Sequence, residues 1–133
     1  MNPPLLLAER ARVRVTLISG HTNECNGDLF LLAPSFENAT AGQRLWSSYL
    51  DHIGESTILG PYAAGTQLEF GLAPASYCAW GNSRPSSGTN ARIALRVPGV
   101  WDIWWEDHQD QDFNDLVVRV EVLPIERIAR PLQ

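Results

Sequence analysis

Cysteine is scarce in this 133-residue sequence, which contains only Cys25 and Cys78. Two cysteines are too few for a disulfide framework, and they are either free buried thiols or the two halves of one bridge. The sequence has no CxxC pair and no clustered histidines, so a zinc site is not expected.

Long apolar runs are also missing, and no stretch approaches the length of a membrane span. The N-terminus reads M-N-P-P-L-L-L-A-E-R-A-R, with three leucines and no basic residues before them. We therefore expect neither a membrane span nor a Sec signal peptide. The protein is then either not exported by Sec or a mature chain with a new Met.

Lysine is absent, and all ten basic residues are arginines. No basic patch interleaved with aromatic residues occurs, so nucleic acid is not an expected partner. The net charge is −5, and five of the fifteen acidic residues lie between Glu106 and Asp115. Without these five the charges balance, so the acidity is local and indicates a site.

Helical periodicity is scarce as well, whereas period-two alternation recurs along the chain. Strands are expected at 12–18, 29–33, 67–72, 92–97, 100–106 and 116–122. With Gly and Pro between them, they predict an all-β, antiparallel sandwich of about seven to nine strands. It is expected to be a single domain over 1–133, with a core of about 12–123 and termini that are extended or docked. One short helix is expected near 43–53, with a broken strand pair as the alternative.

The stretch from Trp101 to Val122 is the most informative part of the sequence: W-D-I-W-W-E-D-H-Q-D-Q-D-F-N-D-L-V-V-R-V-E-V. Alternation assigns Trp101, Ile103 and Trp105 to the core face of a strand, and it assigns Trp104 to the opposite face. A second alternating strand follows from Leu116. The acidic residues lie between the two strands.

These carboxylates repel one another, at about 3–4 kcal/mol for each close pair before salt screening. A bound calcium ion would relieve that repulsion, because calcium takes six to eight oxygen ligands. The segment is not an EF-hand, since Asp115 occupies the glycine position and no helices flank it. Magnesium and a fully solvated acidic loop are the alternatives. The predicted metal ligands are Glu106, Asp107, Asp110, Asp112, Asn114 and Asp115.

The run W-W-E-D-x-x-D-x-D-F-N-D-L-V-V resembles the motif of a bacterial family of uncharacterised domains. That family carries an "fED…gDrDFNDvvv" pattern near its C-terminus and occurs in secreted, surface-attached and adhesin-like proteins. The segments at 27–33, 64–72 and 90–95 are similar too. The resemblance implies a calcium-binding β-sandwich, with matches at Glu106, Asp107, Asp112, Asn114 and Asp115. This chain departs from the pattern in a shorter loop that lacks glycines between Asp107 and Asp112, and in Asn90 where His is expected.

Three functions fit these features, and the first is a non-enzymatic, calcium-binding structural or adhesion module. As an extracellular, cell-surface, filament or virion subunit, it would bind a protein partner or assemble with itself. The second is a calcium-dependent, lectin-like carbohydrate-binding domain in which Trp104 and Trp80, with the loop at 81–90, contact a glycan. The third, a hydrolase, is disfavoured because the carboxylates crowd into one loop and His21, His52 and His108 are scattered.

Overall fold

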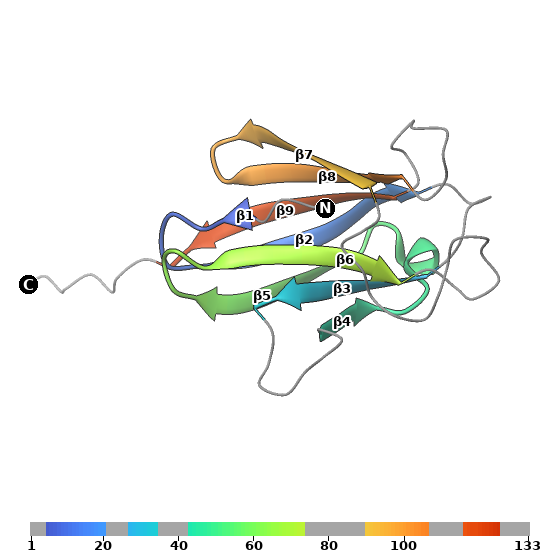
Figure 1. Cartoon of the computed structure of the whole chain (residues 1–133), viewed down its shortest axis with the longest axis horizontal. Helices are drawn as coiled ribbons and strands as arrows, with labels where there is room; N and C mark the ends of the chain where they lie inside the picture. The colour runs from blue at the N-terminus through green and yellow to red at the C-terminus, as the bar shows by residue number, and fades with distance from the viewer. Residues whose placement is uncertain (1–4, 21–26, 35–42, 74–89, 107–115, 126–133) are drawn as a thin grey trace, which may run out of the picture.

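The computed structural model describes residues 5–20, 27–34, 43–73, 90–106 and 116–125. In these residues the chain forms two antiparallel sheets, one of five strands in the order β5-β2-β9-β8-β7 and one of four in the order β1-β6-β3-β4 (Figure 1). The strands are β1 (Leu5–Leu6), β2 (Ala11–Gly20), β3 (Asp28–Ala33), β4 (Gln43–Trp46), β5 (Ser56–Tyr62), β6 (Gln67–Ala73), β7 (Asn90–Val97), β8 (Val100–Glu106) and β9 (Leu116–Pro124). The predicted all-β sandwich is confirmed.

Strand β2 shows how alternation builds the five-stranded sheet. Val13, Val15 and Leu17 are fully buried, whereas the residues between them point to the outer face. On the neighbouring strand, Val118 and Val120 pair with Leu17 and Val15 and are also fully buried. This period of two is the physical reason that one face of the sheet is apolar and the other polar.

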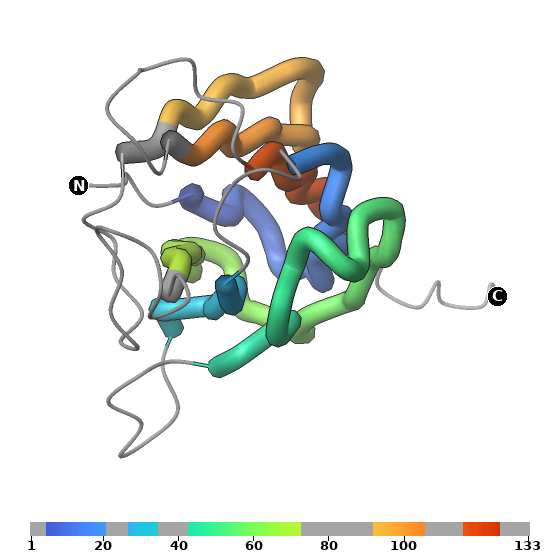
Figure 2. Tube along the Cα trace, turned by 90° about the vertical axis from the view of Figure 1, so that its right-hand side faces the viewer, coloured from blue at the N-terminus to red at the C-terminus, as the bar shows by residue number. Residues whose placement is uncertain are grey.

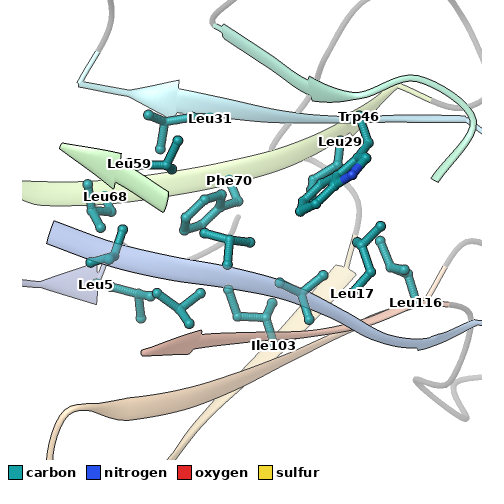
Figure 3. Close-up of a cluster of buried hydrophobic side chains, with 14 of the residues drawn as sticks. Leu5, Leu17, Leu29, Leu31, Trp46, Leu59, Leu68, Phe70, Ile103 and Leu116 are labelled. Carbon is teal, nitrogen blue, oxygen red and sulfur yellow. The ribbon is translucent and has the colours of Figure 1, made fainter. Parts of the chain in front are cut away.

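The apolar faces of the two sheets enclose the core. Figure 2, which looks along the strands, shows the sheets on opposite sides of the interior. Figure 3 shows Leu17, Ile103 and Leu116 of one sheet pointing towards Trp46 and Phe70 of the other. Burying side chains of this size contributes roughly 1.5–3 kcal/mol each, so this core is the main source of stability.

The helix expected near 43–53 is not present as one continuous element. Its first part is strand β4, in which Trp46 pairs with Leu29 of β3. A single turn of 3-10 helix, Tyr49–His52, follows after Ser48, whose φ is 55°. The Tyr49 N–H donates to the Gly27 carbonyl at 2.8 Å, and the Ser48 N–H donates to the Asp28 carboxylate at 3.1 Å. Pairing with the start of β3 therefore overrides the local helical pattern.

The long strands β8 and β9 give the sandwich two distinct ends. At one end β8 stops at Glu106 and β9 begins at Leu116, and at the other end β7 turns into β8 (Figure 1). That turn is Pro98-Gly99, and Gly99 has a φ of 85°, which suits the third position of a type II turn. No helix in the described residues is long and apolar enough to cross a membrane.

Candidate functional site

The acidic segment leaves and re-enters the sheet at two core residues. Trp105 of β8 pairs with Leu116 of β9, and both side chains are fully buried. Glu106 is the last residue of β8, and its backbone pairs with Asn90. The segment that carries the predicted ligands therefore joins two neighbouring strands whose ends are fixed by the core.

Most of the predicted metal ligands lie outside the described residues. These are Asp107, Asp110, Asp112, Asn114 and Asp115, and for Glu106 only the backbone is described. Within the described ranges, no group of three or more His, Cys, Asp or Glu side chains is arranged to hold a metal ion. The calcium prediction therefore depends on the segment from Glu106 to Asp115.

Trp104, one of the two predicted ligand-binding aromatics, lies on the outer face of the five-stranded sheet. Its register neighbours are Arg92 of β7 and Val117 of β9. The side chain is half-buried, in contrast to Trp105, which is completely enclosed. The predicted orientation of Trp104 is thus confirmed, while its role in binding stays a prediction. Trp80 lies outside the described residues, as do Cys25 and Cys78.

Next to Trp104, the structure contains an ionic cluster centred on Asp102 that the sequence analysis missed. Arg119 of β9 donates from Nε to Asp102 Oδ1 at 2.9 Å and from Nη2 to Oδ2 at 3.4 Å. Arg96 of β7 donates from Nη1 to Oδ2 at 2.9 Å. The two guanidinium groups cover the carboxylate, so Asp102 is only 2% exposed although it is on the outer face.

The cluster keeps Asp102 ionised. Its burial by itself raises the pKa of Asp102, because a charge is less stable away from water. The hydrogen bonds from Arg119 and Arg96, together with their charges, outweigh that effect, so the pKa of Asp102 lies below its usual value. The same hydrogen bond raises the pKa of Arg119. The site is therefore a fixed anion with two fixed cations around it.

None of the three residues of this cluster was singled out as a site from the sequence, and Asp102 is the residue that joins the other two. Its partners are 6 and 17 residues away in the sequence. They meet it because β7 and β9 flank β8 and because Arg119 pairs in register with Asp102. Predicting the cluster would have required the pairing register of β7, β8 and β9, which the alternation within a single strand does not provide.

At the other end of the sandwich, a cavity of about 490 Å³ lies beside the β7–β8 turn. Leu6, Leu95, Trp101 and Val122 belong to its apolar lining, and among the described residues Glu9 is the one charged side chain that lines it. A sugar presents many hydroxyl groups that need polar partners when they leave water. This lining is therefore poorly matched to a carbohydrate, and it is at the opposite end of β8 from the acidic segment.

Comparison with solved structures shows a similarity of fold to bacterial lectins. A high-affinity mannose-binding lectin of Ralstonia solanacearum superposes with a TM-score of 0.54 at 14% identity, covering 95% of this chain and 99% of the lectin. The C-terminal domain of the BC2L-C lectin of Burkholderia cenocepacia gives 0.53 at 16% identity, covering 95% and 98%. The CV2L lectin of Chromobacterium violaceum, solved with alpha-methyl-fucoside, gives 0.53 at 13% identity, covering 95% and 99%.

The likeness is one of fold. At these identities it shows that the chain shares the β-sandwich of the three lectins over nearly its whole length. No family model and no curated protein sequence matches the chain.

Proposed function

We propose that this chain is a calcium-dependent carbohydrate-binding module whose ligand site is the acidic segment between β8 and β9. The observation that carries the proposal is the pairing of Trp105 with Leu116. Because of that pairing, five carboxylates have to be accommodated in the short connection of two adjacent strands. A hard cation with many oxygen ligands relieves the repulsion, and its remaining coordination positions can accept sugar hydroxyl groups.

The lectin-like fold supports this function over a purely structural one. One of the similar structures is a mannose-binding lectin, and another was solved with alpha-methyl-fucoside. These two sugars are therefore the first ligands to test. Trp104, half-buried two residues before the end of β8, supplies an aromatic surface on which a sugar ring could stack.

Extracellular calcium suits such a site. Calcium modules outside cells work at dissociation constants of about 10⁻⁴–10⁻³ M. We accordingly expect the module to act outside the cell, at a cell surface or on a virion.

The test is titration calorimetry of mannose and of alpha-methyl-fucoside, with calcium and with a chelator. Binding of at least one sugar is expected in calcium and should disappear in chelator. Asp112→Asn should weaken binding at least tenfold, because it removes one anionic ligand at nearly constant volume. Asp51→Asn is the matched control, since Asp51 is an exposed acid in the 3-10 turn far along the sequence from the segment.

Failure of both sugars to bind in calcium would overturn the proposed carbohydrate binding. If calcium still raised the melting temperature in that case, the chain would instead be the calcium-stabilised structural module that its sequence also allows. Equal loss of binding in Asp51→Asn would show that the effect of Asp112→Asn is not specific to the segment.

A further inference from the structure

The outer face of the five-stranded sheet carries five of the seven arginines in the described part of the chain. We call this surface the arginine face and define it by the outward residues of β2, β9, β8 and β7. Its arginines are Arg12, Arg14, Arg92, Arg96 and Arg119.

Two carboxylates accompany these five arginines among the described side chains of the face. Glu121 lies opposite Arg14, with 3.7 Å between Oε1 and Nη1, and Asp102 holds Arg96 and Arg119. Counted over the described side chains, the face therefore has more positive than negative groups, although the whole chain carries −5. A cationic face on an acidic protein attracts anionic ligands selectively towards that one surface.

Asp102 organises the arginine face for binding. It fixes the two guanidinium groups, but their side chains remain 52% exposed at Arg96 and 32% exposed at Arg119. A guanidinium has five N–H donors, and the contacts to Asp102 use one donor of Arg96 and two of Arg119. Donors held in place in this way can bind a second anion with less loss of side-chain entropy.

Trp104 adds an uncharged contact to the same face. It is on β8 two residues from Asp102, opposite Arg92 on the neighbouring strand. Planar guanidinium groups recognise carboxylate and sulfate, and an indole face packs against the apolar side of a sugar ring. The two chemistries together match a sugar that carries an anionic group.

We propose that the arginine face binds acidic polysaccharide, a polymer of sugars bearing carboxylate or sulfate groups. This binding goes beyond the proposed function, because it needs no metal ion and depends on the arginines of the sheet face, with Trp104 common to the two sites. The face spans several strands about 4.8 Å apart, so an extended polymer could contact more than one of its arginines.

Nucleic acid is the competing polyanion, and the composition of the face disfavours it. Proteins that bind single-stranded nucleic acid stack successive bases on several aromatic side chains. Trp104 is the one aromatic residue among the described outward side chains of the arginine face.

The test measures binding to polygalacturonate, dextran sulfate, neutral dextran and oligothymidylate, all in chelator and at two ionic strengths. Salt-sensitive binding to polygalacturonate or dextran sulfate is expected, with none to neutral dextran. The tighter of the two anionic arms identifies the acidic group that is recognised. Because chelator is present throughout, these results are independent of the calcium-dependent sugar binding proposed above.

The variant is Arg92→Gln with Arg96→Gln, which removes two charges from β7 and leaves Arg119 on Asp102. Its affinity for the acidic polymer should fall about tenfold, and its salt dependence should become shallower. The matched control is Arg10→Gln with Arg44→Gln, which removes the same charge at exposed positions outside the arginine face. That control should lose less than about twofold.

Three results would overturn the proposal. These are no binding of either acidic polymer at low salt, an equal loss of affinity in the control, and tighter binding of oligothymidylate than of both polysaccharides. Trp104→Leu gives a second, uncharged readout: affinity should fall several-fold while the salt dependence stays the same, because stacking moves no counterions.

Discussion

Two acidic features belong to β8 and to the chain that follows it: the single carboxylate of Asp102 and the five carboxylates of the acidic segment. Asp102, on the strand itself, receives guanidinium groups from both neighbouring strands. The segment from Glu106 to Asp115 contains five carboxylates and no basic residue apart from His108. The fold supplies the cations in the first case, whereas in the second case we propose that the cation comes from solution.

The comparison indicates what decides whether a charged group stabilises the fold or forms a binding site: whether the fold itself supplies the opposite charge. The buried carboxylate of Asp102 already has two cationic partners within the fold. In the proposed calcium site, the neighbouring carboxylates repel one another, and a bound cation would relieve that repulsion. The contribution of the acidic segment to the free energy of unfolding should therefore depend on calcium, and the contribution of the Asp102 cluster should not.

Calcium removal should produce the largest effect. At a calcium concentration 100 times the dissociation constant, binding adds about 2.7 kcal/mol to the free energy of unfolding. For a domain of this size, loss of that energy lowers the melting temperature by roughly 10 °C. Thermal melts of the wild type with calcium and with chelator measure it, and Asp112→Asn should melt low in both.

The control for that melt is Asp51→Asn, which should keep the full response to calcium. If the melting temperature of the wild type did not change with chelator, the acidic segment would not depend on calcium. The proposed difference between the acidic segment and Asp102 would then be wrong.

Arg119→Met should give the next largest effect. It removes the bidentate partner of Asp102 and leaves a buried carboxylate with Arg96 alone. Breaking a fully buried pair costs 3–5 kcal/mol, and because Arg119 is one-third exposed we expect about 2 kcal/mol. Urea unfolding measures it, and chelator should lower the stability of this variant by the same amount as that of the wild type.

Arg96→Met is the matched comparison, because it breaks the single contact from the more exposed arginine. Its cost should be below about 1 kcal/mol. If Arg96→Met were as destabilising as Arg119→Met, the two guanidinium groups would contribute equally, contrary to the geometry.

Strands whose apolar residues alternate strictly could be predicted from the sequence. The expected strand at 100–106 coincides with β8, and the one at 12–18 is β2 shortened by one or two residues at each end. In both, the inward residues are large and apolar, so that periodicity and burial agree. The acidic segment could also be recognised from the sequence, because its residues are close neighbours along the chain.

Strand β5 and the Asp102 cluster could not be predicted in this way. In β5, Leu59 and Thr57 face inwards while Ile58 is exposed, and Gly60-Pro61 within the strand reads as a turn. Partnership with β2 decides that strand, and the register of three strands decides the cluster around Asp102. Both depend on long-range pairing, which the hydrophobic pattern of one segment does not contain.

Acidification should produce a smaller change in the free energy of unfolding, and its sign should differ between Asp102 and the acidic segment. Because the pKa of Asp102 is lower in the folded state than the usual value near 3.9, the folded protein binds fewer protons there than the unfolded chain. Its contribution to stability is thus complete above about pH 5 and is lost as the pH falls through the folded pKa. Asp102→Asn, which has no such titration, should therefore lose less stability than the wild type between about pH 5 and pH 3, as urea unfolding can measure.

The acidic segment should respond in the opposite direction when calcium is absent. Protonation there removes repulsion between like charges, so in chelator it opposes the loss at Asp102, whereas in calcium it displaces the ion and adds to that loss. The wild type should consequently lose more stability on acidification in calcium than in chelator. The same acid loss in both conditions would mean that the segment holds no ion, while the difference between wild type and Asp102→Asn would still report on the cluster alone.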